Sequence, residues 1–443
     1  MNAVTRRPDG PVPAPIPGAL PGPGIAPPRA RHARARAGTF GVLDIGSTKI
    51  VCIIARLEPD GLPRALGYGW QRSHGVKGGN LVDLAAAERA VRAAVAQAEE
   101  MAEIKLSGVI VNLSCGQPES RQQHIQWTIG GRAVTDADLR AMVSEGRRRM
   151  ADEGREAVHA LPLGFTLDAT PGVADPRGMI CESLGMRLHL VDAASASLRN
   201  LGTGLARCDL EVEEPVSAPY AAALSALGED ERELGAVVID MGGGTTSLAV
   251  LHEGVLLHTA QVPVGGWQVT NDLARGLSTP LDQAERLKTM HGSMIGTIED
   301  EREMLSLSQV GEDGEMLSRV PRARMLKIIR PRVEETLELI RDRLAEVDLG
   351  PDAGQRVVLT GGASQLVGVR EAAARILGRQ VRLGRPQLVR GLPEAFHAPG
   401  FATTLGLIAW GGGEGRPSLD FDNYQQVSRG ILSRFVNWLR DRV

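Results

Sequence analysis

Two short segments of the chain share one pattern of apolar and polar residues. In residues 42–50 and again in residues 238–246, an apolar run ends at an aspartate, a glycine turn with small hydroxyl residues follows, and a second apolar run begins. This pattern predicts two strands joined by a tight turn in each segment. A third apolar run leads into a Thr-Gly-Gly-Ala turn within residues 357–364, and it predicts a strand followed by a turn and a helix.

Apolar periodicity in the rest of the chain predicts both helices and strands. Helical spacing occurs at residues 84–98, 136–150, 193–204, 218–227, 267–277, 279–291, 333–347 and 401–410. Short apolar runs predict strands at 65–70, 109–113, 157–161 and 186–191. We expect an exposed charged turn at 229–233 and a polar loop at 296–320. The predicted fold class is α/β, with a compact α+β insertion between residues 114 and 192.

The composition is that of a globular protein without a general affinity for nucleic acid. The 443 residues are 43% hydrophobic, and 50 basic residues are balanced by 53 acidic ones. We therefore expect no nucleic-acid partner. The cysteines, Cys52, Cys115, Cys181 and Cys208, lie far apart without metal-ligand spacing, so reduced thiols are expected.

The sequence has no apolar stretch of the length that a membrane span needs. Residues 1–37 are rich in Pro, Ala, Gly and Arg and lack the apolar core of a secretory signal. We expect a disordered arm there. The alternative is a basic arm that touches acidic lipid or protein.

The glycine turns indicate phosphate chemistry. Such turns can direct backbone N–H groups and hydroxyls at a phosphate chain from two sides. The aspartates that precede the first two turns, Asp44 and Asp240, can hold water ligands of a Mg²⁺ ion. Together the turns predict a nucleotide in a cleft between two related domains, and the alternative is three ordinary hairpin turns.

The three loops resemble the phosphate-1, phosphate-2 and adenosine loops of the actin-like ATPase superfamily. The resemblance implies that ATP is the nucleotide and that Asp44 and Asp240 position Mg²⁺. The nucleotide-binding residues that it implies are Asp44, Gly46, Ser47, Thr48, Lys49, Asp240, Gly242, Gly243, Gly244, Thr245, Thr246, Glu285, Lys288, Gly361, Gly362 and Ala363.

Within this superfamily, residues 38–443 are similar to the FtsA family of bacterial cell-division proteins. Residues 229–245, a charged segment that leads into the second glycine loop, carry much of the likeness. The resemblance implies an actin-like two-domain ATPase fold in which an FtsA-type α+β subdomain is inserted for filament and partner contacts. The implied organisation is a disordered arm (1–37), a first domain (38–113, 193–213 and 391–410), the insertion (114–192), a second domain (214–256 and 331–390), a small subdomain (257–330), a flexible linker (411–427) and a membrane-targeting helix (428–443).

The last sixteen residues have the pattern of an amphipathic helix lying in a membrane surface. Its apolar stripe includes a single Trp, and arginines lie opposite or beside it. The residues expected at the membrane are Ile431, Leu432, Arg434, Phe435, Val436, Trp438, Leu439 and Arg440. The alternative is a C-terminal helix that packs on the protein core. FtsA proteins carry a similar membrane-binding tail.

Hydrolysis is not expected to be fast. Comparison with the superfamily places Ala218 where enzymes that turn over carry a Glu or Gln that orients the attacking water. An alanine cannot do this. Glu214 is near in sequence but lies one helical turn away from the position of Ala218. The catalytic residue is therefore unknown, and we expect ATP binding with at most weak ATPase activity.

The small subdomain is expected to bind the acidic and apolar C-terminal peptide of FtsZ, the tubulin-like partner of FtsA. Basic residues cluster there at Arg319, Arg322, Arg324 and Lys327, and Arg322 falls at a peptide-contact position of the family. The alternative is a solvated basic start of a helix.

These features predict a cytoskeletal adaptor. It would bind ATP, self-associate into filaments, attach to anionic lipid on the cytoplasmic face of the inner membrane at the division septum, anchor FtsZ filaments there and help to recruit later division proteins. The alternatives are a sugar kinase of the same superfamily, and an actin-like pilus-assembly scaffold. A kinase would need a catalytic carboxylate and a sugar pocket, and neither alternative accounts for the amphipathic tail.

Overall fold

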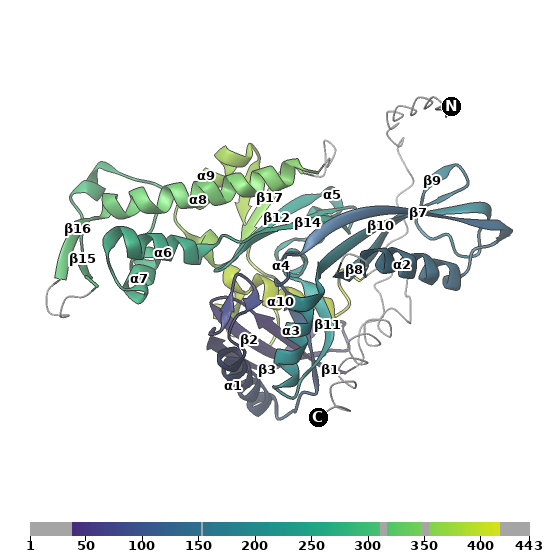
Figure 1. Cartoon of the computed structure of the whole chain (residues 1–443), viewed down its shortest axis with the longest axis horizontal. Coiled ribbons are helices and arrows are strands. Elements are labelled where there is room, and N and C mark those ends of the chain that lie inside the picture. Colours follow the sequence, from purple (N-terminus) through teal and green to yellow (C-terminus); the bar gives the residue numbers. More distant parts are fainter. Residues whose placement is uncertain (1–37, 152–153, 311–316, 348–353, 417–443) are drawn as a thin grey trace, which may run out of the picture. The chain divides into compact units, whose positions relative to one another are not determined.

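The computed structural model describes residues 38–151, 154–310, 317–347 and 354–416. Two five-stranded sheets in it share one arrangement of strands. In each sheet, three strands that follow one another in the sequence are antiparallel, and two further strands continue the sheet parallel to the first of these three. Strands of both sheets are labelled in Figure 1. The first sheet, in the order β11-β6-β1-β2-β3, contains β1 (Thr39–Ile45), β2 (Lys49–Leu57), β3 (Pro63–Arg72), β6 (Gly108–Leu113) and β11 (Glu211–Ser217). The second sheet, in the order β14-β13-β12-β17-β18, contains β12 (Ala236–Met241), β13 (Thr246–His252), β14 (Val255–Val262), β17 (Arg356–Thr360) and β18 (Gln380–Leu383). The repeated sequence pattern thus lies at equivalent places in two equivalent sheets.

Helix α1 (Leu84–Ala102) packs closely on the first sheet. The Asp83 carboxylate caps its N-terminus by accepting a hydrogen bond from the Ala86 N–H at 3.0 Å. A Cβ on Gly69 of β3 would lie 2.1 Å from the carbonyl oxygen of Ala94, so only glycine allows this approach. Helix α3 (Ser195–Ala206) and the short hairpin of β4 (Val76–Lys77) and β5 (Asn80–Leu81) complete this part.

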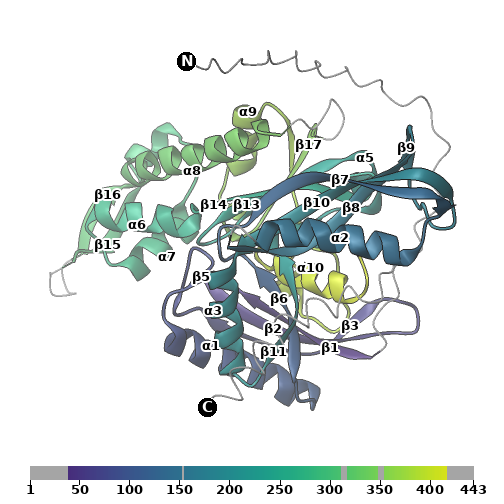
Figure 2. The same ribbon diagram turned by 45° about the vertical axis from the view of Figure 1, so that its right-hand side comes forward.

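Two helices join the sheets into one apolar core. These are α4 (Ala218–Ala226) and α10 (Ala402–Gly411), and α10 is labelled between the two sheets in Figure 2. Their backbones touch, because a Cβ on Gly406 would lie 1.7 Å from the carbonyl oxygen of Ala221. The buried cluster around them includes Val42 of the first sheet and Val238 of the second. The two sheets and the two helices therefore share one continuous apolar core.

The insertion forms an antiparallel sheet with its own core. Its strands, in the order β7-β10-β8-β9, are β7 (Glu119–Ala133), β10 (Ile180–Ala194), β8 (Arg155–Leu167) and β9 (Thr170–Val173), and α2 (Asp136–Ala151) packs on them (Figure 2). The strands are longer than the sequence analysis predicts, because polar residues on the exposed face interrupt the apolar runs.

A small helical subdomain flanks the second sheet. It contains α6 (Gly266–Leu277), α7 (Leu281–His291), η1 (Ile298–Glu301), β15 (Met304–Ser308), β16 (Leu317–Pro321) and α8 (Arg322–Ala345). The expected polar loop at 296–320 is wrong in part, since β15 and β16 pair and bury Leu305, Leu307 and Val320. Helix α8 begins well before the expected residue 333 and includes Pro331.

The remaining elements include one helix where a turn was expected. Residues Glu229–Leu234 form α5, because the side chain of Glu231 accepts a hydrogen bond from the Gly228 N–H at 3.0 Å and caps the helix start. The others are η2 (Gly362–Gln365), α9 (Val369–Leu377), η3 (Glu394–His397) and η4 (Pro399–Phe401).

The first residues of the expected linker pack on the protein. The Tyr220 hydroxyl donates a hydrogen bond to the carbonyl oxygen of Gly415 at 2.6 Å, and the Arg416 guanidinium pairs with Glu214 at 3.0 Å. The expectation of a free linker from residue 411 is therefore wrong for 411–416. Residues 1–37 and 417–443, which hold the predicted arm and membrane helix, lie outside the described residues. Within the described ranges, no helix is both long enough and apolar enough to cross a bilayer.

Candidate nucleotide-binding site

The three glycine loops line one pocket of about 590 Å³ between the two sheets. The first loop joins β1 to β2, the second joins β12 to β13, and the third follows β17. Every residue that the sequence analysis predicts for nucleotide binding lines this pocket, including Glu285 and Lys288, which come from α7 rather than from a loop. The fold thus brings together residues that are far apart in the sequence.

The first two loops have the same backbone geometry. The Gly46 N–H donates to the Lys49 carbonyl oxygen at 3.0 Å, and the Gly242 N–H donates to the Thr245 carbonyl oxygen at 2.9 Å. A Cβ on Gly46 or Gly242 would lie 2.9 Å from the same oxygen, so both turns favour glycine. Residues of both loops line the pocket.

The two loops also touch. A Cβ on Gly243 would lie 2.3 Å from Cγ2 of Thr48, and a Cβ on Gly244 would lie 2.3 Å from Oγ of Ser47. Behind the second loop, the N–H groups of Gly266 and Trp267 at the start of α6 donate to the carbonyl oxygens of Gly242 and Gly243 at 2.9 and 2.7 Å. The glycines therefore bring the two halves of the cleft into contact and anchor the second loop to a helix.

Three charged groups lie at the floor of the pocket. Burial raises the pKa of Asp44, and burial also raises the pKa of Asp240 to about 6. Burial lowers the pKa of Lys49, which lies within electrostatic reach of both carboxylates. The Lys49 ammonium donates to the Gly400 carbonyl oxygen and stands 4.4 Å from the centre of the Phe401 ring. The positive charge of Lys49 thus compensates the negative charges of the two aspartates in a part of the pocket with little water.

Two threonines that the sequence analysis did not single out bind these aspartates. The Thr404 hydroxyl donates to Asp44 at 2.6 Å, and the Thr403 hydroxyl donates to Asp240 at 2.9 Å. Both threonines lie in the first turn of α10, whose other residues are mostly apolar. Two neighbouring threonines in an otherwise apolar helix are the sequence feature from which a polar contact at this position could have been predicted.

The chemistry of the floor suits a hydrated Mg²⁺ ion. Mg²⁺ retains several waters and is held by one or two carboxylates together with substrate phosphates. Asp44 near the end of β1 and Asp240 near the end of β12 supply two carboxylates to the pocket. Within the described ranges, no cluster of three or more His, Cys, Asp or Glu residues could hold a metal ion.

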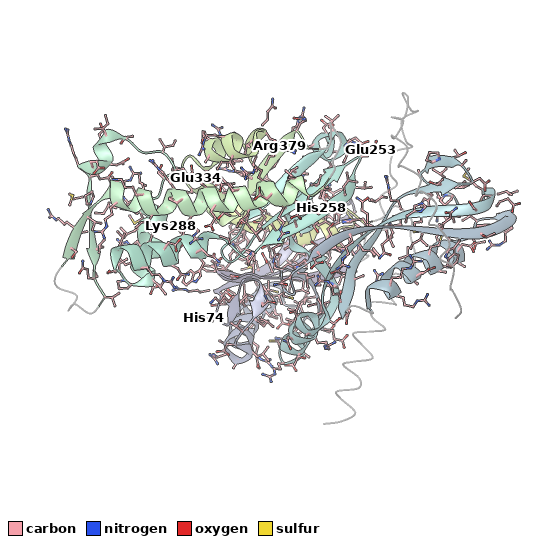
Figure 3. All side chains as sticks on the ribbon, turned by 45° about the horizontal axis from the view of Figure 1, so that its top comes forward. His74, Glu253, His258, Lys288, Glu334 and Arg379 are labelled. Atoms are coloured by element: carbon pink, nitrogen blue, oxygen red, sulfur yellow. The ribbon has the colours of Figure 1, made fainter. Side chains whose placement is uncertain are left out.

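Lys288 of α7 forms a network of polar contacts at the pocket, which is also lined by apolar side chains. The Lys288 ammonium donates to the Gly266 carbonyl oxygen, to the Thr270 hydroxyl and to Glu285, at 2.9, 2.8 and 2.7 Å; Lys288 is labelled in Figure 3. Val333, Leu366 and Val367 also line the pocket. The pocket thus offers both polar groups and apolar surface.

Glu214 is committed to contacts outside the pocket. Its carboxylate is buried and accepts hydrogen bonds from the Trp410 indole at 2.7 Å and from Arg416 at 3.0 Å. Ala218 lines the pocket, but it has no polar side chain. Neither residue is suited to orienting an attacking water.

The basic residues predicted for partner binding have different environments. Arg322 donates to the His291 carbonyl oxygen at 3.0 Å and forms an ion pair with buried Asp300. Lys327 is 76% exposed and lies 3.4 Å from Glu301, and Arg319 is exposed on β16. Arg322 is thus part of the local structure, whereas Arg319 and Lys327 face solvent. The predicted membrane residues all lie in 428–443, outside the described residues.

Comparison with known proteins agrees with the resemblance seen in the sequence. Residues 237–406 match the family described as "Cell division protein FtsA", and residues 115–192 match the "SHS2 domain inserted in FTSA", which corresponds to the insertion described above. The chain is 46% identical to the cell division protein FtsA of Rhizobium meliloti (strain 1021) over 85% of this chain and 87% of that protein. It is 32% identical to the cell division protein FtsA of Escherichia coli (strain K12) over 90% of this chain and 96% of that protein.

Among solved structures, a chain of the PilM-PilN type IV pilus biogenesis complex resembles this protein with a TM-score of 0.61. The sequences are 18% identical, and the match covers 85% of this chain and 99% of that chain, so the likeness concerns the fold alone. The predicted α/β, actin-like fold with an inserted subdomain is confirmed. The chain belongs to the FtsA family of cell division proteins.

Proposed function

We propose that this protein binds ATP with Mg²⁺ in the cleft, polymerises, and anchors FtsZ filaments to the cytoplasmic face of the inner membrane at the division septum. The observation that carries this proposal is the meeting of three glycine loops around one pocket, with Asp44 and Asp240 at its floor. In this proposal, the filament also recruits later division proteins through the inserted subdomain.

The residues of the cleft have distinct roles in the proposed binding. Backbone N–H groups and hydroxyls of the two facing loops bind the phosphates, and the Glu285–Lys288 pair orients the sugar. The bound Mg²⁺ ion neutralises phosphate charge. Because Gly243 and Thr48 lie in contact, a nucleotide held by both loops links the two halves of the cleft. Polymerisation then depends on the nucleotide, because the two linked halves form a single surface for contact with the next protein in the filament.

Turnover is expected to be slow. A fast ATPase needs a group that orients the attacking water. Ala218 offers no such group, and the carboxylate of Glu214 is engaged by Trp410 and Arg416. The nucleotide therefore serves mainly as a structural ligand of the filament.

The proposed membrane contact is made by the C-terminal segment. Complete burial of one large apolar side chain stabilises by about 1.5–3 kcal/mol, and the cost of ordering the segment offsets much of the total. One tail then binds weakly, whereas a row of tails on a polymer binds tightly through effective concentration. Assembly and membrane attachment reinforce each other by this route.

The proposed FtsZ contact lies in the small subdomain. Arg319 and Lys327 offer exposed positive charge, and Ile298 of η1 is 86% exposed. Exposed cations near an apolar side chain suit a peptide that is acidic and apolar. Arg322 stabilises the local structure of this surface through its ion pair with Asp300.

Co-sedimentation with vesicles of anionic lipid tests the whole proposal. The full chain is compared with Trp438→Glu and with a chain that ends after Arg416, because that end point keeps the Glu214–Arg416 pair. We expect Mg-ATP to increase pelleting of the full chain only. Equal pelleting of all three proteins would contradict the proposed role of the tail, and loss of the ATP effect would contradict the link to the nucleotide.

A further inference from the structure

A short corner of the chain, residues 399–404, contacts all three loops of the cleft. The Pro399 carbonyl oxygen accepts a hydrogen bond from the Gly361 N–H of the third loop at 3.1 Å. The Gly400 carbonyl oxygen accepts one from Lys49 of the first loop. The next residues, Thr403 and Thr404, donate to Asp240 and Asp44. Hydrogen bonds of this corner thus connect the three loops at the pocket.

The two hydroxyls act on opposite halves of the cleft. Thr404 is fully buried and donates to Oδ2 of Asp44 at 2.6 Å, and Thr403 is 9% exposed and donates to Oδ2 of Asp240 at 2.9 Å. Both residues lie at the N-terminal end of α10, where the helix dipole also favours negative charge. A hydroxyl that donates to a carboxylate makes a short, directional hydrogen bond. Each carboxylate is therefore held in one orientation by a rigid helix.

We propose that Thr403 and Thr404 are positioning residues for the nucleotide-bound Mg²⁺ ion. This inference rests on the proposed function, because it assigns residues to the same site. By holding one oxygen of each aspartate, the threonines fix the orientation in which the carboxylates meet the water ligands of the ion. Because consecutive residues of one helix hold aspartates from both halves, the ion site forms only when the halves have the correct relative position.

A purely structural role for the hydroxyls makes a different prediction. If they only satisfy buried carboxylates, their loss lowers stability and affects ATP binding equally with and without Mg²⁺. If they position the carboxylates for the ion, their loss reduces mainly the part of the affinity that depends on Mg²⁺. The ratio of the dissociation constants of ATP in EDTA and in Mg²⁺ separates the two roles.

The experiment measures that ratio by calorimetry for the full chain and its variants. Valine replaces threonine with a similar shape and no hydroxyl, so the variants are Thr403→Val and Thr404→Val, with Thr404→Ser as the conservative rescue. Thr279→Val is the matched control, because Thr279 is buried and its hydroxyl donates to the Ser308 carbonyl oxygen at 2.8 Å, outside the cleft. Melting temperatures show whether each variant is folded.

We expect each valine variant to lose at least fivefold in the ratio, while its affinity in EDTA stays within twofold of wild type. Thr404→Ser and Thr279→Val are expected to keep the wild-type ratio. If Thr404→Val does not fold, Thr403→Val, at the less buried position, decides the matter. An unchanged ratio in a folded valine variant would overturn the inference and leave ATP binding intact, whereas a wild-type chain that binds no ATP would overturn the proposed function as well.

Discussion

Gly243 and Thr48 are in direct contact across the cleft, and no side chain larger than hydrogen fits between them. A Cβ on Gly243 would lie 2.3 Å from Cγ2 of Thr48, a distance that requires the Thr48 side chain or one of the loops to move. Gly243 belongs to the second domain and Thr48 to the first. Gly243 thus contributes, together with Gly244, to the close approach of the two halves of the cleft.

The substitution Gly243→Ala should weaken ATP binding, because the added methyl group separates the two loops that are proposed to hold the phosphates. We expect at least a tenfold increase in the dissociation constant of Mg-ATP, measured by calorimetry, with little change in melting temperature. Gly228→Ala is the control, since a Cβ there would meet only the end of the Glu231 side chain at 3.9 Å. Wild-type affinity in Gly243→Ala would rule out simultaneous contact of both loops with the nucleotide.

The substitution Glu214→Gln should affect stability and leave turnover unchanged. The amide cannot accept from Trp410 and Arg416 as the carboxylate does, and loss of buried hydrogen bonds to a charged group costs about 2 kcal/mol. Urea unfolding measures this loss, and phosphate release measures turnover, which is expected to stay within twofold. A drop in turnover of tenfold or more would instead identify Glu214 as catalytic.

The basic residues of the small subdomain should respond differently to mutation. Arg322→Ala leaves Asp300 without this ion-pair partner and is expected to lower the melting temperature. Arg319→Glu changes an exposed residue and is expected to weaken capture of an acidic FtsZ peptide at least fivefold while the melting temperature stays constant. Fluorescence anisotropy of a labelled peptide gives the affinity. Unchanged affinity in Arg319→Glu would make this residue part of an ordinary solvated surface.

Acid should destabilise the protein through buried histidines. Burial lowers the pKa of His159 to about 3 and that of His189 to about 3. The unfolded chain therefore binds more protons between pH 3 and the ordinary histidine pKa of about 6.5, so stability falls as the pH drops below that value. We expect each histidine to contribute a loss of about 1 kcal/mol between pH 7.5 and pH 5.5.

Urea unfolding at the two pH values measures this loss, and His159→Gln should reduce it. The glutamine oxygen can replace the ring nitrogen that accepts a hydrogen bond from the Ser217 N–H at 3.0 Å. An equal pH dependence in the variant and the wild type would mean that other groups cause the effect.

The repeated strand-turn-strand units and their glycine turns could be predicted from the sequence because each signal is local, whereas Glu285 and Lys288 of α7 were expected at the pocket only from the family resemblance. Asp44 and Asp240 follow apolar strands in the same way, and the strand order then places them at one cleft. The helix predicted at 333–347 begins earlier, at Arg322, because its first turns are rich in arginine and lack the apolar stripe from which a helix is predicted. Likewise, the Arg322–Asp300 and Arg416–Glu214 pairs join residues that only the fold brings together, so no local pattern revealed them.

Calorimetric titration of the full chain with Mg-ATP is the most direct test of the nucleotide site. The three loops around one pocket predict saturable binding of one ATP per chain, which weakens when Mg²⁺ is removed with EDTA. Absence of saturable binding up to millimolar ATP, together with an unchanged melting temperature, would contradict the proposal that this cleft holds a nucleotide.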